Sequence, residues 1–393
     1  MKELLLIFLF QITFSLDTKI ISVNYIHNFG KPSIKITLYE NRTHYVYLNT
    51  FLPYTHLDKD DWPIDKKEST KIDLCHTYES FECESLLSTK NFEISSLLYY
   101  IGDNIHFGPD QGLALNYKFN NERYSLIHQL YNENKISHKV FVFETNKDTK
   151  NFHFGGIPNQ AYLNYTYSGY CNIDNTFPNW GCNVTEISYN NETFKLNSYA
   201  LFHSAFVGQI YSNSLFELFV KSILKKEIEQ KICERESVSE DRDRITCKYS
   251  FQDTETFHKN VIIKFGNMEI HYPIEKIFDF DDGIWESRLW TNPYHLYKKY
   301  DIIFSSRFIE AFNYAVFDYE NNRIEFYSDK ITINMLQSST NKIIKIILVV
   351  MLCMLSLNVF VLILNKVMIN KTEYFVINLL CKFRLLINTS YYH

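Results

Sequence analysis

A histidine with a serine beside it is the first combination in this chain that could do chemistry. His203 and Ser204 follow the apolar residues 200–202, a pattern typical of a buried strand that ends in a tight turn. An imidazole can act as a general base near neutral pH, with a serine hydroxyl as nucleophile. Neighbouring residues of a strand point to opposite faces, however, so the spacing argues against a direct dyad. We therefore expect His203 to be a hydrogen-bonded, buried polar residue.

The composition predicts a β-rich body and excludes nucleic acid as a partner. The chain has 393 residues, of which 17% are aromatic, whereas glycine and proline are scarce. Strands are enriched in aromatic residues, and a chain of this length calls for two lobes or one large body. The formal net charge is −5, with lysine and arginine spread along the chain, so no basic face is expected.

Two apolar stretches predict a membrane-anchored protein of the secretory pathway. Residues 1–15 carry Lys2 and an apolar run, the pattern of a signal peptide, for which the rival interpretation is a buried first strand. Residues 346–364 are long and apolar enough to cross a bilayer, with a buried core helix as the rival. Basic residues are in excess after this segment. We therefore expect a single-pass type I protein with a luminal or extracellular body, a stalk at 331–345 and a cytoplasmic tail at 365–393.

Cysteines and glycosylation sequons agree with the secretory pathway. Six of the eight cysteines precede the apolar segment, and their order suggests three local disulfides, although the sequence leaves the pairing open. The suggested pairs are Cys75 with Cys83, Cys171 with Cys182, and Cys233 with Cys247. A zinc site is the rival, but no CxxC spacing supports it, and we expect no metal and no cofactor. The four candidate glycosylation sites are Asn41, Asn164, Asn183 and Asn191.

The periodicity of apolar residues predicts a mostly β fold with short helices. The alternation of apolar and polar residues predicts strand pairs at 20–39, 139–157, 183–201, 261–272 and 314–327. Helical spacing predicts short helices at 123–135 and 214–232. The charged run at 234–244 predicts a solvated loop between Cys233 and Cys247.

Three segments resemble the pepsin-like aspartic peptidases. FGGIPNQAY at 154–162 is similar to the family's Phe-Gly-Gly segment, and YAVFDYENNRIEFY at 314–327 is similar to its closing strand pair. RYSLIHQLYNENKISHKVFVF at 123–143 resembles the helix and strand that precede them. The resemblance covers roughly residues 20–328, nearly the whole body. It implies a two-lobed β architecture, with lobes at 16–145 and 146–330 and a cleft between them.

The resemblance also implies where two catalytic aspartates would lie. In the family each lobe supplies an Asp-Thr/Ser-Gly loop, and the two carboxyl groups share a proton. The first loop here would be Asn49-Thr50-Phe51 and the second His203-Ser204-Ala205. Both aspartates and both glycines are thus replaced, while the two hydroxyl residues are retained. The chain has no Asp-Thr-Gly or Asp-Ser-Gly, and Asp281-Asp282-Gly283 lacks the hydroxyl residue.

Other parts of the family's site depart from its pattern as well. The segments that brace the two loops would carry Leu115 and Phe304 in place of glycine. No convincing flap hairpin is found, since Tyr99 and Tyr100, the nearest candidates for its tyrosine, fit core or surface roles better.

These departures favour an inactive protein. An amide cannot exchange protons as a carboxyl does, and one imidazole cannot form the shared-proton pair. We expect a membrane-anchored, peptidase-like protein that binds a peptide or protein in the interlobe cleft. The alternatives are an active aspartic-type endopeptidase with a non-standard site and a structural surface protein.

Overall fold

The computed structural model describes most of the chain from Lys19 to Leu336 and short segments after it. The described residues are 19–28, 30–38, 42–51, 55–58, 69–75, 78–88, 93–102, 112–116, 125–146, 149–158, 165–174, 179–206, 208–239, 242–287, 289–291, 300–336, 351–358, 375 and 378–382. Residues up to Leu336 form one compact unit, the body, and those from Gln337 form a second. The expected signal peptide and the sequons at Asn41 and Asn164 lie outside the described residues.

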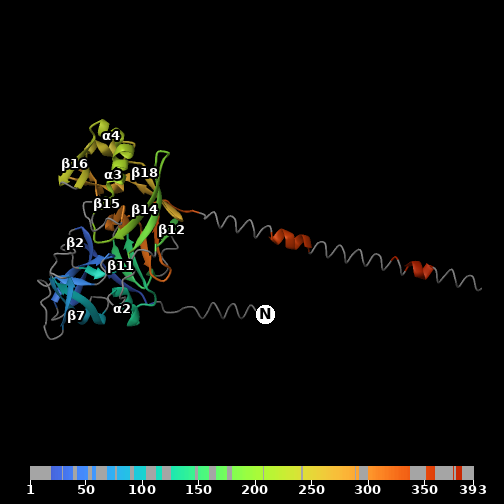
Figure 1. The fold of residues 1–393 in the computed structure, drawn as a ribbon, viewed down its shortest axis with the longest axis horizontal. Helices are drawn as coiled ribbons and strands as arrows, with labels where there is room; N and C mark the ends of the chain where they lie inside the picture. Colours follow the sequence, from blue (N-terminus) through green and yellow to red (C-terminus); the bar gives the residue numbers. More distant parts are fainter. Residues whose placement is uncertain are drawn as a thin grey trace, which may run out of the picture. The chain divides into compact units, whose positions relative to one another are not determined.

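A six-stranded antiparallel sheet, the central sheet, takes strands from both ends of the body (Figure 1). Its spatial order is β1 (Ile21–Asn24), β11 (Lys150–Phe154), β10 (Val140–Thr145), β24 (Tyr314–Asp318), β25 (Arg323–Ser328) and β12 (Tyr167–Asn172). The alternating sequence of β10 gives it two apolar faces. Phe141 and Phe143 enter the main core, whereas Val140 and Val142 belong to a smaller cluster. The strand pairs predicted at 139–157 and 314–327 are confirmed.

Residues of the N-terminal part build an eight-stranded sheet. Its order is β2 (Ile26–Asn28), β3 (Lys31–Leu38), β4 (Arg42–Asn49), β9 (Gly112–Ala114), β5 (His56–Asp58), β8 (Glu93–Gly102), β7 (Tyr78–Ser88) and β6 (Ser69–Cys75). Gly30 lies between β2 and β3 with φ at 77°, a conformation that glycine adopts without strain. β4 and β9 run parallel, so β9 supports the end of β4.

A second eight-stranded sheet comes from the C-terminal part. Its order is β22 (Leu289–Thr291), β15 (Gln209–Tyr211), β23 (Ile302–Ser305), β14 (Glu192–His203), β13 (Gly181–Tyr189), β18 (Asn260–Phe265), β19 (Met268–Pro273) and β26 (Ile333–Met335). The β13–β14 hairpin turns at Asn190 and Asn191, whose φ values of 47° and 70° fit a type I′ turn. β14 runs parallel to β23, which repeats the relation of β4 to β9.

Short helices connect these sheets. They are α2 (Leu126–Asn132), α3 (Asn213–Leu218), the π-helix η4 (Phe219–Ile223), α4 (Lys225–Glu229), α5 (Ser306–Glu310) and the 3-10 helices η5 (Tyr249–Asp253) and η6 (Ile274–Ile277). Both predicted helices are found, but the one expected at 214–232 consists of α3, η4 and α4 in succession. Its apolar stripe is buried at Leu215, Phe219 and Ile223.

The charged run at 234–244 is a hairpin and not the expected loop. β16 (Cys233–Ser239) and β17 (Arg242–Lys248) pair within a four-stranded sheet that continues with β21 (Ile284–Ser287) and β20 (Phe278–Asp281). The charges alternate in sign and pair across strands: Arg235 contacts Asp243, and Arg244 contacts Glu236 at 2.9 Å. Because the opposite charges face each other, a charged segment is stable as a strand pair.

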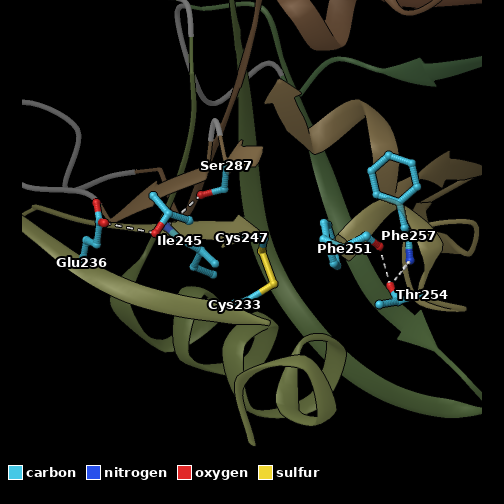
Figure 2. Close-up of a disulfide and its surroundings, with 9 residues drawn as sticks. Cys233, Glu236, Ile245, Cys247, Phe251, Thr254, Phe257 and Ser287 are labelled. Atoms are coloured by element: carbon cyan, nitrogen blue, oxygen red, sulfur yellow. Dashed lines mark hydrogen bonds between the residues drawn. A yellow bond between two sulfur atoms is a disulfide. The ribbon is translucent and has the colours of Figure 1, made fainter. Parts of the chain in front are cut away.

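Two of the three suggested disulfides are present. Cys171–Cys182 joins β12 of the central sheet to β13, and Cys233–Cys247 joins directly opposite residues of β16 and β17. Figure 2 shows the second bridge beside Ile245, whose N–H donates to the Ser287 hydroxyl at 2.9 Å. Disulfides form and persist in oxidising compartments, and both bridges fit such a setting for the body.

The suggested pair Cys75–Cys83 is corrected by the register of β6 and β7. The sequence predicts a short loop between them, but they lie on two paired strands, with Cys75 opposite Tyr78 and Cys83 opposite Ser69. Six strand residues separate these positions, roughly 20 Å, and a disulfide needs α-carbons within about 7 Å.

Two structural observations bear on the expected domain boundaries. The lobe boundary expected at 145/146 falls between β10 and β11, which are neighbours in the central sheet. Residues 331–336, where the stalk is expected to begin, belong to the body, because β26 pairs with β19 and the Leu336 N–H donates to the Asn267 carbonyl at 2.8 Å. Ile331 and Ile333 are buried, which ties this segment to the body.

The second unit contains helical residues at 351–358 and 378–382. The first of these lies inside the membrane segment expected at 346–364, whose remaining residues are not described. In the part of the chain that the structure describes, no helix has both the length and the apolar character needed to cross a bilayer.

Candidate functional site

The candidate site lies where β4 and β14 end. β4 ends at Asn49 and β14 at His203, and each strand is followed by a hydroxyl residue, Thr50 or Ser204. The site residues inferred from the sequence are all deeply buried, with Asn49 3% exposed, His203 4%, and the two hydroxyl residues 0%. The structure therefore brings together two segments that lie 154 residues apart.

Reciprocal hydrogen bonds lock the two segments together. The Thr50 N–H donates to the Ser204 hydroxyl oxygen, and the Ser204 N–H donates to the Thr50 hydroxyl oxygen, both at 3.0 Å. Each hydroxyl in turn donates to a carbonyl across the interface, Thr50 to Phe202 at 2.7 Å and Ser204 to Leu48. Both hydroxyl groups thus have a structural role at this site.

Asn49 uses its side chain to form a turn. Its Oδ1 accepts the Phe51 N–H at 2.9 Å, and its carbonyl accepts the Leu115 N–H at 3.0 Å. The Phe51 carbonyl accepts the Asn116 Nδ2–H at 3.0 Å, which holds the turn from the other side. A primary amide has no proton to exchange in the physiological range, so Asn49 can position a ligand but cannot act as acid or base.

His203 lies between two aromatic rings. The Phe51 ring stacks on the imidazole with centroids 5.0 Å apart and planes 17° apart. Phe206 meets the imidazole edge-on at 4.9 Å. Burial lowers the pKa of His203 to about 3, and the positive charge of Lys31 contributes in the same direction. The imidazole is therefore neutral at any pH above that value.

The parallel neighbours of β4 and β14 brace the site. Asn49 is level with Ala114 of β9, and His203 is level with Ser305 of β23. These two residues occupy equivalent places in the two halves of the site. They lie one residue away from Leu115 and Phe304, where the sequence comparison expected the bracing positions.

An aromatic cluster adjoins His203 on the face of β14 that points away from the main core. Its buried members are Tyr199, Leu201, Tyr300 and Ile303, and the partly exposed Phe51 and Phe206 pack against them. Alternation explains the cluster, because Ala200 and Phe202, the intervening residues of β14, enter the main core. The roles of Phe51, Phe206 and Asn116 were not foreseen, since only the folded chain shows which turn residues cover a strand end.

The remaining candidates lie apart from this site. Asp282 and Gly283 have positive φ values and form the exposed turn between β20 and β21, so Asp281-Asp282-Gly283 is a hairpin turn. Asn183 and Asn191 are both exposed, as glycosylation requires. The backbone of Tyr99 and Tyr100 belongs to β8.

Comparison with known proteins supports the architecture. No protein-family profile and no curated protein sequence matches the chain. Among solved structures, the aspartic proteinase from Irpex lacteus superposes with a TM-score of 0.59, covering 79% of this chain and 98% of that chain. The fold is pepsin-like. Sequence identity over the match is 12%, so the likeness extends to the fold alone.

Asn49 and His203 are not the pair of carboxyl groups with a shared proton that aspartic peptidase chemistry uses. A base must take a proton from water while an acid gives one to the scissile carbonyl. Asn49 can do neither, and His203, whose pKa is lowered to about 3, is a neutral imidazole and not an imidazolium acid at higher pH. The arrangement instead offers a neutral amide, a neutral imidazole and two aromatic rings, which are groups suited to binding.

Proposed function

We propose that the protein is a membrane-anchored binding protein with a pepsin-like fold and no peptidase activity. The observation that carries this proposal is the contrast at one place in the fold. The Thr50–Ser204 hydrogen bonds keep the two strand ends in register, yet the residues before them, Asn49 and His203, are an amide and an imidazole and not two carboxyl groups.

The Phe51 ring over His203 is a second observation that supports the absence of peptidase activity. Phe51 takes the place at which the resemblance implies a glycine, and its ring stacks on the imidazole at 5.0 Å. Returning carboxylates to positions 49 and 203 would therefore leave an aromatic side chain over the site. Loss of one central catalytic group costs on the order of 10⁴ to 10⁶ in rate, and here both are replaced.

The ligand that we propose is a peptide or protein segment with an apolar side chain, held between the lobes. Phe51 and Phe206 are partly exposed at the edge of the aromatic cluster and offer contact area to such a side chain. Because His203 stays neutral above a pH of about 3, its charge does not change between pH 4.5 and 7, and affinity should stay constant over that range.

The proposed location is the secretory pathway, with residues 346–364 as anchor. The two disulfides and the exposed sequon residues Asn183 and Asn191 support an oxidising, luminal or extracellular setting for the body. A chain that stops after Leu336 should be released into the medium, whereas the full chain should stay with membranes. Recovery of both forms in the medium would contradict the anchor.

Activity is tested on the full-length protein in detergent with a mixed peptide library between pH 3 and 7. Mass spectrometry should find no cleavage above that of an Asn49→Ala, His203→Ala double variant. Cleavage that the double variant lacks, and that a transition-state mimic of aspartic peptidases blocks, would establish the alternative of an active peptidase.

Binding is tested by passing the same library over immobilised protein. Peptides retained by the wild type should be released by Phe51→Ala and by Phe206→Ala. Tyr249→Ala is the matched control, because Tyr249 is an aromatic residue that is 56% exposed outside the aromatic cluster. Equal retention by all four proteins would exclude the interlobe site, and no retention by any of them would leave the alternative of a structural surface protein.

A further inference from the structure

Three side chains form a hydrogen-bonded row on the outer face of the central sheet. The Ser22 hydroxyl oxygen lies 2.8 Å from His153 Nδ1, and His153 Nε2 lies 3.0 Å from a carboxylate oxygen of Glu144. The residues come from β1, β11 and β10, which are neighbours in the sheet. A nucleophile, a base and a group that orients the base thus lie in hydrogen-bond sequence.

Strand register explains why Ser22 and His153 meet. They are directly opposite in the β1–β11 pair. The Tyr25 N–H donates to the Lys150 carbonyl at 3.1 Å, so these two opposite residues form a hydrogen-bonded pair. Opposite pairs alternate in type along an antiparallel ladder, and the pair of Ser22 and His153, three positions away, is therefore one without backbone hydrogen bonds. Side chains approach most closely in such pairs. Ser22 is exposed and His153 is 3% exposed, so the hydroxyl faces solvent and the imidazole is held beneath it.

Glu144 is fixed by several donors besides the histidine. Asn151 Nδ2 donates to it at 2.6 Å, and Asn146 Nδ2 and the Tyr314 hydroxyl each donate at 2.8 Å. The hydrogen bond from His153 is the main cause that lowers the pKa of Glu144 to about 2. The carboxylate is therefore ionised and can only accept hydrogen bonds.

This ionisation determines the histidine tautomer. Since Glu144 only accepts, His153 Nε2 must carry the hydrogen that points to it. In the neutral imidazole Nδ1 then has a lone pair directed at the Ser22 hydroxyl, which donates to it. The two ring nitrogens exchange the roles that they have in the serine protease triad, but the chain of donors and acceptors is the same.

We propose that Ser22, His153 and Glu144 form a second site, which hydrolyses small carboxylic esters with an apolar acyl group. This site is separate from Asn49 and His203 and does not depend on the proposed binding function. Val142 lies directly opposite His153 on β10, and its cluster includes the partly buried Ile157 and Tyr165. These apolar neighbours favour an apolar acyl group.

The proposed reaction proceeds in two balanced steps. Ser22 Oγ attacks the ester carbonyl while His153 Nδ1 takes the hydroxyl proton. The bond to the alkoxy group then breaks, and His153 gives its proton to the leaving alcohol, which produces an acyl-serine. Water attacks this acyl group, His153 takes a proton from the water, and Ser22 leaves as its hydroxyl form with that proton, releasing the carboxylic acid. Glu144 is a positioning residue that stabilises the imidazolium in both steps.

A fluorophosphonate probe tests the activation of Ser22 in the full-length protein. The probe should label Ser22, located by peptide mass spectrometry, and Ser22→Ala should abolish that label. Ser168 is an internal control, because it is an exposed serine on β12 of the same sheet. Equal labelling of Ser22 and Ser168, or no labelling of either, would overturn the proposal.

Ester hydrolysis gives the second readout, with p-nitrophenyl butyrate as the probe. His153→Gln can still donate to Glu144 but cannot take a proton, so it should reduce kcat by about 100-fold or more, as loss of a general base does. Ser22→Ala changes one exposed hydroxyl and keeps the fold, so full hydrolysis by this variant would refute the assignment. Ser168→Ala should hydrolyse at the wild-type rate. Glu144→Gln should lower both the labelling of Ser22 and the rate of ester hydrolysis. Unchanged values of both would show that Glu144 has no part in the site.

Discussion

The backbone N–H of Thr50 donates to the Ser204 hydroxyl oxygen, and the backbone N–H of Ser204 donates to the Thr50 hydroxyl oxygen, both at 3.0 Å. Both residues are fully buried. A buried N–H without a partner costs about 1–3 kcal/mol, so each hydroxyl contributes to the stability of the fold. Both hydroxyl residues therefore have a structural role at this site.

Removal of either hydroxyl should destabilise the protein. Thr50→Ala leaves the Ser204 N–H and the Phe202 carbonyl without their partner, and we expect a loss of about 1–3 kcal/mol in the free energy of unfolding. Thr50→Ser should lose less, because it keeps the hydroxyl. The combined Thr50→Ala, Ser204→Ala variant should lose less than the sum of the two, since both remove the same bonds. Denaturant unfolding measures these values, with exposed Ser250→Ala as control.

His203 should make stability depend on pH. Its pKa is about 3 in the folded protein against an ordinary value of 6.5, so the unfolded chain binds more protons between these values. The free energy of unfolding should therefore fall as pH drops from 6.5, by up to about 1.4 kcal/mol per pH unit. Glu144 has a lowered pKa too, but its contribution is lost only below about pH 4.5. His203→Phe should flatten the curve between pH 6.5 and 5, whereas Ser250→Ala, at an exposed position, should not.

Gly181 should not tolerate a side chain. A Cβ atom there would lie 2.5 Å from the Tyr199 ring, which belongs to the aromatic cluster. Gly181→Ala should therefore destabilise by about 1–3 kcal/mol and displace Tyr199. Gly266→Ala is the matched control, because no atom lies within 4 Å of its added Cβ. Equal thermal unfolding of the two variants would contradict the packing described for Tyr199.

Peptide mapping without reduction should recover two disulfide-linked peptide pairs from the body, Cys171–Cys182 and Cys233–Cys247. A Cys75–Cys83 peptide should be absent, because these residues lie roughly 20 Å apart along their strands. Replacing Cys171 and Cys182 together with alanine should cost about 2–4 kcal/mol, since the bridge restricts the unfolded chain. Detection of Cys75–Cys83 would refute the register of β6 and β7.

The sequence predicted the strands whose side chains alternate clearly, and the hairpin turns that carry their own signals. Asn190 and Asn191 tolerate positive φ, so the β13–β14 turn was visible in the sequence. The run at 234–244 forms strands and not the predicted loop, because opposite charges, which suggest a solvated loop, also pair across a hairpin. Cysteine order cannot reveal register, and for that reason the Cys75–Cys83 suggestion failed.

At the site, the sequence singled out Asn49 and His203 by a family resemblance but did not show what surrounds them. Phe51 was recognised as a departure from glycine, yet only the folded chain shows its ring against His203. The same holds for Ser22 and His153, which lie 131 residues apart and meet only through strand pairing. Contacts of this kind have no local sequence signal.

The central sheet cannot be completed until late in the synthesis of the chain. β10 is flanked by β11 on one side and by β24 on the other, and β24 begins at Tyr314. Ribosomes add about 5–20 residues per second, so the roughly 170 residues between these strands leave one edge of β10 open for on the order of 10 s. That edge exposes an alternating Val-Phe sequence, which is prone to pair with other chains. The nascent body should therefore depend on a chaperone until its last hairpin has emerged.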